Sequence, residues 1–146
     1  MSVPFHKCAG HLSRLVPPEK MRATVELALK FLERYEYDTL AFSGLSGFLL
    51  GPVLCYLTGK EMIAVRKPGD NTHSFYTVEG NKNAERYIIV DDFIGSGETV
   101  RRIENEVKNF APEAICLGVL ESFYLGDEWA RGRGLSPIPK EWSMSI

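Results

Sequence analysis

The sequence has few cysteines, little net charge and no long hydrophobic run. Three widely spaced cysteines in 146 residues argue against a disulfide framework, so we expect a reduced, cytoplasmic protein. A net charge of −2 provides no basic field that would attract nucleic acid or an anionic membrane. No apolar stretch approaches membrane-spanning length, and the N-terminus shows no signal-peptide pattern. Internal repeats and low-complexity tracts are also lacking.

What is present is typical of a globular protein. A hydrophobic fraction of 45% and a charged fraction of 25% allow a substantial buried core in a chain of this length. We therefore expect a single domain over residues 1–146. Its irregular parts are predicted to be an N-terminal arm (1–16), a flexible lid loop (66–86) and a C-terminal tail (121–146).

The most informative stretch runs from Tyr87 to Thr99, with the sequence YIIVDDFIGSGET. Its four apolar residues predict a strand that is buried on both faces. Two adjacent carboxylates, Asp91 and Asp92, follow at the strand end, where water or a ligand can reach them. A turn of small residues then leads into an amphipathic helix starting at Thr99. Such a turn before a helix N-terminus predicts an anion site, because free backbone N–H groups and the helix dipole point into one space.

Two common phosphate-binding patterns do not match this stretch. The Walker pattern requires a lysine after the second glycine, where this chain has Glu98. The dinucleotide pattern requires a third glycine where this chain has Val100. The remaining description is a phosphate loop preceded by an acid pair, which suits a ligand with a phosphate at one end and a diol nearby. A ribose 5-phosphate group has this form. The alternative is an ordinary strand-to-helix turn with a capping Ser or Thr.

A second strand-loop-helix unit lies earlier in the chain. A short strand over residues 39–42 is followed by a loop of small residues, 43–47, and a helix over residues 48–57. The loop is a weak candidate anion site, because glycine turns after strands are common. Another strand, residues 62–65, ends in Arg66 and Lys67. These cations are either anion ligands, which we favour beside two candidate phosphate loops, or a solvated strand end.

The order of elements predicts the fold class. Helices over residues 18–35 and 99–110 and a strand over 115–120 complete an alternation of strands and helices. This alternation is typical of a doubly wound α/β domain, with a mostly parallel sheet and helices on both faces. All the candidate segments follow strand carboxyl ends, where such folds bind their ligands. We therefore expect these segments to form one site.

The stretch from Tyr87 to Thr99 resembles the phosphoribosyl pyrophosphate (PRPP) signature of type I phosphoribosyltransferases. The segment 42–52 and the Arg-Lys pair are similar to adenine phosphoribosyltransferase-like members. The resemblance implies the type I phosphoribosyltransferase fold with a small or reduced hood, and lid-hairpin residues at Tyr76, Glu79 and Gly80. By position, it implies that the ribose hydroxyls are bound by Asp91 and Asp92, and the 5-phosphate by Gly95, Ser96, Gly97, Glu98 and Thr99. Pyrophosphate would be bound by Ser43, Gly44, Leu45, Ser46 and Gly47, and by Arg66 and Lys67, often across a dimer interface.

The resemblance also implies an activity. The chain would be a PRPP- and Mg²⁺-dependent pentosyltransferase of nucleotide salvage, acting as a homodimer and releasing pyrophosphate from PRPP. The metal would have no direct protein ligand, or would meet Asp91 and Asp92 through ribose or water. Gly95 stands where hypoxanthine-type members carry an acid as general base, which disfavours a hypoxanthine-type acceptor, and the segments similar to adenine enzymes favour an adenine-like purine. Two alternatives are a catalytically silent PRPP- or nucleotide-binding regulator and, less favoured, a nucleic-acid-binding regulator on this fold.

Both ends of the chain carry weaker signals. His6, Cys8 and His11 could suggest a metal site, but too few ligands stand nearby for tetrahedral coordination, so an irregular arm is the favoured interpretation. After the last strand, Phe123 or Tyr124 could stack on an acceptor base, although core or interface packing is favoured. The segment 129–134 is a small basic patch with a tryptophan, and we interpret it as a solvated turn.

Overall fold

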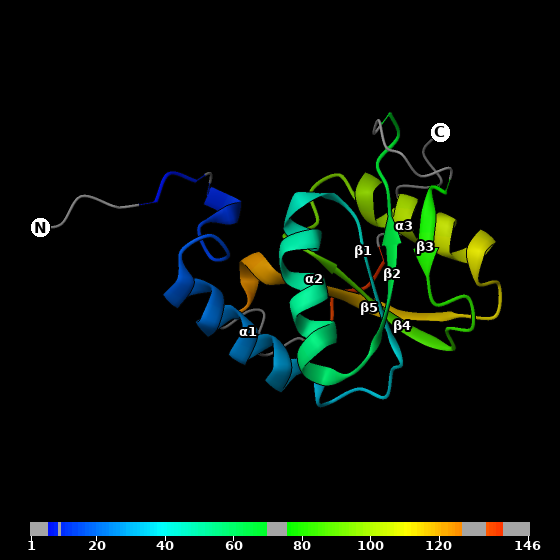
Figure 1. Cartoon of the computed structure of the whole chain (residues 1–146), viewed down its shortest axis with the longest axis horizontal. Coiled ribbons are helices and arrows are strands. Elements are labelled where there is room, and N and C mark those ends of the chain that lie inside the picture. The colour runs from blue at the N-terminus through cyan, green and yellow to red at the C-terminus, as the bar shows by residue number, and fades with distance from the viewer. Residues whose placement is uncertain (1–5, 9, 70–75, 127–133, 139–146) are drawn as a thin grey trace, which may run out of the picture.

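A computed structural model of the chain describes residues 6–8, 10–69, 76–126 and 134–138. Five strands form one sheet in the order β3-β2-β1-β4-β5 (Figure 1). Strands β2, β1, β4 and β5 are parallel, and only the edge strand β3 is antiparallel. The mostly parallel sheet expected from the sequence is therefore confirmed. The strands are β1 (Thr39–Phe42), β2 (Glu61–Val65), β3 (Val78–Gly80), β4 (Arg86–Asp91) and β5 (Ile115–Glu121).

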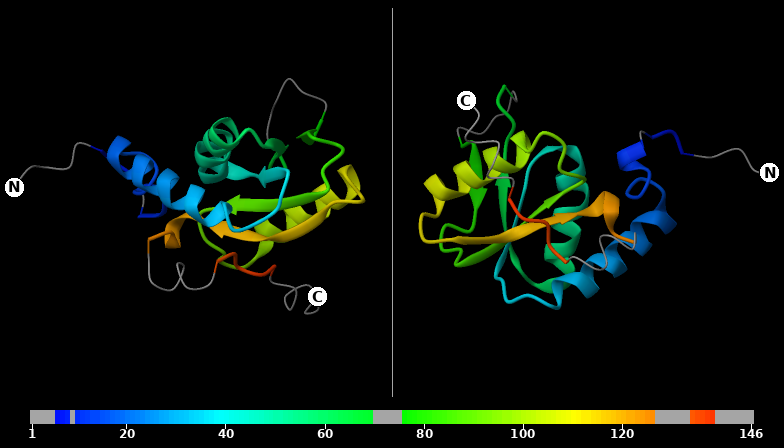
Figure 2. Two further views of the ribbon diagram at one scale, coloured as in Figure 1. Left: turned by 90° about the horizontal axis from the view of Figure 1, so that it is seen from below. Right: turned by 180° about the vertical axis from the view of Figure 1, so that it is seen from behind.

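Three helices cover the two faces of this sheet (Figure 2). They are α1 (Pro18–Leu32), α2 (Gly44–Thr58) and α3 (Glu98–Phe110). Helix α1 begins at Pro18, in the first turn, where a missing backbone N–H costs nothing. Helices α1 and α2 pack on one face and α3 on the other, as the two separate hydrophobic clusters show. The expectation of helices on both faces is confirmed.

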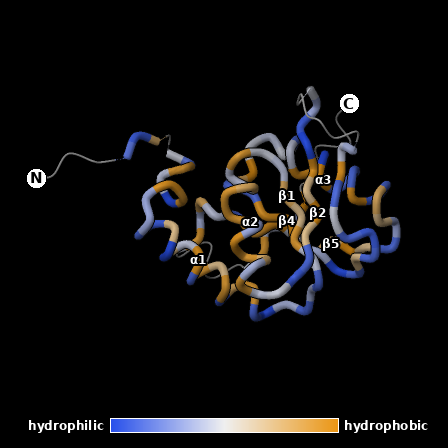
Figure 3. The backbone as a smooth tube through the Cα atoms, in the orientation of Figure 1, coloured by the Kyte–Doolittle hydropathy of each residue, from blue (hydrophilic) through white to orange (hydrophobic). Residues whose placement is uncertain are grey.

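Side-chain alternation along the strands supplies both hydrophobic clusters. In β1, Leu40 and Phe42 belong to the cluster under α1 and α2, whereas Ala41 lies in the cluster under α3. In β4, Ile88 and Ile89 divide between the clusters in the same way. Figure 3 shows the result as an apolar centre with hydrophilic segments around it. Because β1 and β4 are buried on both faces, most of the residues in the sequences of these two strands are hydrophobic.

The predicted loop 43–47 is wrong, because helix α2 already begins at Gly44. The glycines of this segment have a packing role. A Cβ at Gly47 would lie 2.9 Å from Phe42 Cβ, and one at Gly51 would lie 2.3 Å from Phe42 Cδ1. Positions 47 and 51 share one helix face, so their missing side chains let α2 lie directly on β1. Among the three glycines of α2, only Gly44, with φ +78°, has the left-handed backbone expected of a loop glycine.

The segments predicted as lid and tail are partly described. The lid range 66–86 contains strand β3. This strand pairs with β2 in an antiparallel arrangement, in which Val65 lies opposite Val78 and Ile63 opposite Gly80. Residues 70–75 lie outside the described residues, as do 1–5, 9, 127–133 and 139–146, and with them most of the basic patch. In the tail, Ser136 forms an antiparallel bridge with Val119 of β5. Within the described ranges, no helix has both the length and the apolar content needed to span a membrane.

Candidate functional site

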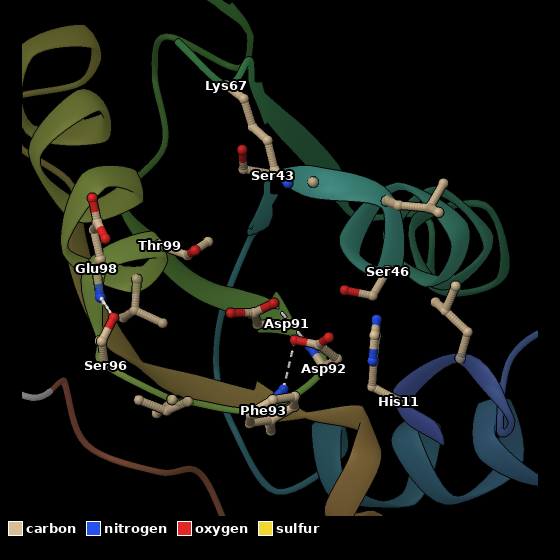
Figure 4. A pocket seen from close by; sticks show the side chains of 17 residues that line it. His11, Ser43, Ser46, Lys67, Asp91, Asp92, Phe93, Ser96, Glu98 and Thr99 are labelled. Atoms are coloured by element: carbon tan, nitrogen blue, oxygen red, sulfur yellow. Dashed lines mark hydrogen bonds between the residues drawn. The ribbon is translucent and has the colours of Figure 1, made fainter. Parts of the chain in front are cut away.

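The chain leaves β1 toward one edge of the sheet and β4 toward the other, so the carboxyl ends of these neighbouring strands diverge. This is the switch point at which open α/β sheets bind ligands. A cavity of about 380 Å³ lies there (Figure 4). We call it the β1/β4 cavity. Four segments of the chain line it: His11 and Leu12, residues 43–46, Lys67, and residues 91–100.

The acid pair lies in the middle of the β1/β4 cavity. Asp91 is the last residue of β4, and its side chain is only 6% exposed. Its Oδ1 accepts a hydrogen bond from the backbone N–H of Asp92 at 2.8 Å. Asp92 Oδ1 accepts one from the N–H of Phe93, also at 2.8 Å. The backbone after the strand therefore holds both carboxyl groups in place.

Burial changes the acidity of this pair. Desolvation raises the pKa of Asp91 from 3.8 to about 7, and the hydrogen bond with the Asp92 side chain acts in the same direction. The charges of Asp92 and Glu121 add to the increase, against the lowering effect of the Asp92 N–H. A cation placed against Asp91 would favour its charged form, and a diol could form hydrogen bonds with it. The acid pair is therefore suited to a polyhydroxyl ligand.

The predicted phosphate loop lines one end of the cavity. Gly97 has φ +84° and is the N-cap of α3, a backbone conformation that favours glycine. Ser96 Oγ accepts a hydrogen bond from the N–H of Glu98 at 3.3 Å. Glu98, Thr99 and Val100 from the first turn of α3 also line the cavity. The N-terminal end of the helix dipole therefore faces the space where an anion would bind.

A second helix N-terminus faces the same cavity from the β1 side. Ser43 occupies the N-cap position of α2, and Gly44, Leu45 and Ser46 from the first turn of this helix line the cavity with Lys67. The Lys67 side chain lies close over Gly44, since a Cβ there would be 3.1 Å from Lys67 Cε. This part of the cavity thus combines a dipole and a cation, which favours an anion.

Four of the residues proposed from the sequence lie elsewhere. Arg66 does not line the β1/β4 cavity; its Nη2 lies 3.3 Å from Glu79 Oε1, and its Nε donates to the Tyr76 carbonyl oxygen. Gly47 packs on β1. Phe123 and Tyr124, in the short 3-10 helix η2 (Ser122–Tyr124), do not line the cavity; the Phe123 ring centroid lies 5.9 Å from that of Phe93, which does line it.

The structure also adds residues that the sequence analysis did not select. His11, from the short 3-10 helix η1 (Gly10–Leu12), and Phe93 line the cavity. Arg102 of α3 donates from Nη2 to Ser43 Oγ at 2.8 Å and ties the two helix N-termini together. Buried Glu121 accepts a hydrogen bond from the N–H of Ile94 at 2.8 Å and contacts the Ser136 hydroxyl. Their sequence signals were weak: His11 was noted only as part of an unfavoured metal site, Phe93 as part of the stretch 87–99, and Arg102 and Glu121 are polar side chains near the ends of predicted elements.

Comparisons with known proteins agree with this architecture. No family model matches the chain. It is 26% identical over 121 residues to an adenine phosphoribosyltransferase of Petrotoga mobilis, covering 70% of each chain. It is 32% identical over 131 residues to that of Rhodopirellula baltica, covering 78% of this chain and 63% of the relative. The solved Saccharomyces cerevisiae adenine phosphoribosyltransferase, complexed with an imino-altritol bisphosphate and adenine, superimposes with a TM-score of 0.56 at 26% identity, covering 83% and 78%.

These relatives, the sheet order and the cavity at its switch point all bear out the resemblance stated for residues 87–99. The chain belongs to the type I phosphoribosyltransferases, a family of PRPP-dependent pentosyltransferases.

Proposed function

We propose that the chain transfers the phosphoribosyl group of PRPP to a nitrogenous base, with an adenine-like purine as the favoured acceptor, and releases pyrophosphate. The observation that carries the proposal is the convergence of an acid pair, two helix N-termini and a lysine on one cavity. PRPP has the matching parts: a diol in the middle and two phosphate groups that extend from different ends of the sugar. The adenine preference rests on the relatives, whose names specify adenine.

Each part of PRPP has a counterpart in the cavity. Residues 95–99 would hold the 5-phosphate at the N-terminus of α3, and Asp91 and Asp92 would bind the ribose hydroxyls. Residues 43–46 and Lys67 would bind the pyrophosphate group. We leave Arg66, Gly47, Phe123 and Tyr124 out of this site because they do not line the cavity.

The groups that line the cavity are suited to the charges that develop during this reaction. The acceptor nitrogen forms a bond to C1 of the ribose while the bond from C1 to the pyrophosphate oxygen breaks. Positive charge develops on the sugar and negative charge on the leaving group. The α2 N-terminus and Lys67 would stabilise the leaving group, and the carboxylates would stabilise and orient the sugar.

A magnesium ion fits this site as a partner of the substrate. Among the residues that the structure describes, no three His, Cys, Asp or Glu side chains are placed to hold a metal. Mg²⁺ commonly keeps several waters and binds one or two carboxylates together with phosphate oxygens, and Asp91 and Asp92 would supply that contact, directly or through ribose and water. When bound, Mg²⁺ would neutralise charge on the pyrophosphate.

Calorimetric titration with PRPP, with and without Mg²⁺, tests the site. We expect Mg²⁺-assisted binding that Asp92→Asn abolishes, since the substitution removes a carboxylate charge from the cavity and keeps the side-chain size. Glu113→Gln, which replaces a carboxylate outside the cavity, is the matched control, and this variant should bind PRPP normally. Absence of binding by the wild-type chain would refute the proposal. Binding without pyrophosphate release in the presence of adenine would instead favour a catalytically silent PRPP-binding regulator.

We further propose that the chain forms a homodimer through α2. This helix of 15 residues, GLSGFLLGPVLCYLT, contains no charged side chain. Leu45, Phe48, Tyr56 and Leu57 are exposed on its outer surface, Tyr56 at 86%. An apolar outer face on a helix that is already packed on a sheet favours an isologous contact with a second copy. Sedimentation should give twice the monomer mass, and Tyr56→Glu should lower it; a monomeric wild-type chain at micromolar concentration would refute the dimer.

A further inference from the structure

The N-terminal arm, interpreted from the sequence as irregular, brings His11 to the β1/β4 cavity. In Figure 4 the imidazole of His11 lies beside Ser46 and Asp92, across the acid pair from Ser96 and Thr99. The cavity therefore has three ends around its central carboxylates. The phosphate loop forms one end, Lys67 and Ser43 the second, and His11 with Phe93 the third.

Several contacts hold this part of the arm in place. The ring centroids of His11 and Phe93 are 6.3 Å apart in an edge-on arrangement. Phe93 packs against Phe123, and the Arg14 guanidinium lies 5.7 Å from the centroid of the Phe123 ring. The Arg14 carbonyl oxygen accepts a hydrogen bond from the Thr24 hydroxyl of α1 at 2.8 Å. Helix α1 and the 3-10 helix η2 thus position the arm from both sides.

The third end has no substrate group assigned to it by the proposed function. A sugar whose 5-phosphate and pyrophosphate occupy the other two ends still needs space for the acceptor that attacks C1. An edge-on imidazole and a phenyl ring suit a flat heteroaromatic acceptor, which can stack on or pack against the rings while the imidazole exchanges a hydrogen bond. The third end therefore fits the acceptor.

The acceptor must also lose a proton, and the cavity offers few groups for it. The ionisable side chains that line the cavity within the described residues are His11, Lys67, Asp91, Asp92 and Glu98. Lys67 and Glu98 lie at the two ends assigned to anions, and the aspartates lie between them, where the proposed function places the sugar. Gly95 has no side chain to accept a proton. His11 is exposed, so it can pass a proton on to water.

We propose that His11 binds the acceptor base and accepts the proton that its nitrogen loses, with Phe93 as the apolar wall of the acceptor site. In this step the acceptor nitrogen forms the bond to C1, the electron pair of the breaking C1–O bond leaves with pyrophosphate, and the N–H proton moves to a neutral imidazole nitrogen of His11. The proton then passes to solvent. This inference rests on the proposed function and assigns its acceptor site.

Binding of AMP and of ribose 5-phosphate separates the two proposals. Both compounds contain the sugar phosphate, and only AMP contains a base. We expect His11→Ala to weaken the affinity for AMP about 10-fold, which corresponds to the loss of roughly one hydrogen bond and a ring contact. The affinity for ribose 5-phosphate should stay within about twofold of the wild-type value. His6→Gln, a histidine of the same arm outside the cavity, is the control and should change neither.

Turnover with PRPP and adenine tests the proton step. We expect His11→Ala to lower kcat about 100-fold with little change in the KM for PRPP, and free imidazole to restore part of the rate. Unchanged kcat, or an equal loss of AMP and ribose 5-phosphate affinity, would overturn the role of His11 and leave the proposed function standing. A wild-type chain that binds neither compound would overturn the proposed function itself.

Discussion

Replacing Asp91 by asparagine should stabilise the fold, most strongly above neutral pH, while removing a carboxylate that we propose binds the ligand. Asparagine has almost the same shape, and its Oδ1 can still accept the hydrogen bond that the N–H of Asp92 donates. What the substitution removes is a carboxyl group that burial makes difficult to ionise, with a pKa raised from 3.8 to about 7. If removing the charge while keeping the side-chain shape makes the fold more stable, Asp91 is placed for binding and not for stability.

The sign and size follow from proton linkage. Because the folded-state pKa of Asp91 is raised, the folded chain binds more protons than the unfolded chain between about pH 4 and pH 7. The free energy of unfolding therefore falls as pH rises through this window. At about 1.36 kcal/mol per pKa unit the full effect is roughly 4 kcal/mol, an upper limit because the carboxylate can gain water when it ionises. Between pH 5 and pH 8 we expect a change of about 2 kcal/mol.

Urea unfolding of the wild type and Asp91→Asn at pH 5, 6, 7 and 8 measures this effect. The difference between the two chains cancels contributions from other titrating groups. We expect the variant to be the more stable chain throughout this series, because Asp91 is already ionised in the unfolded wild-type chain at pH 5, and we expect its advantage to grow by about 2 kcal/mol between pH 5 and pH 8. A difference that stays constant across this range would refute the burial argument for Asp91.

Two further substitutions test the surroundings of the site. Glu121→Gln removes a charge that raises the pKa of Asp91, so the stability of this variant should depend less on pH between 5 and 7; an unchanged slope in the same urea series would contradict this. Gly51→Ala should lower stability by about 1 to 2 kcal/mol, because its Cβ would lie 2.3 Å from Phe42 Cδ1 and the gain in helix propensity offsets only part of that clash. The thermal midpoint measures this loss, and a smaller loss in a Phe42→Leu background would confirm its cause.

Much of the fold could be predicted because its signals are local. The continuous apolar run at Tyr87–Val90 becomes a central strand, since only burial on both faces favours such a run. The glycine turn at Gly95–Gly97 precedes a helix whose apolar positions recur at helical spacing. Strand-helix alternation then requires a mostly parallel sheet, and with it a common edge for the strand carboxyl ends.

The glycines of α2 show where local signals were ambiguous. A run of Ser and Gly after a strand predicts a turn, and at Gly44 the backbone does adopt one. Gly47 and Gly51 carry no such information by themselves. Their purpose depends on the Phe42 ring beneath them, a contact between two different elements. Propensity therefore favoured a loop, whereas tertiary packing formed a helix.

By itself the sequence determined the sheet class, the acid pair, the candidate phosphate loop and the edge of the sheet where they lie. Only the tertiary structure decided which other side chains meet them. Arg66 forms an ion pair with Glu79, Arg102 donates a hydrogen bond to Ser43, and the N-terminal arm places His11 in the same cavity as the acid pair. The spacing of apolar residues and the choice of turn residues depend on a few neighbouring positions, so they predict individual helices, strands and turns. Contacts between segments far apart in the chain depend on strand order and on how side chains fill the space between layers, and folding decides these together.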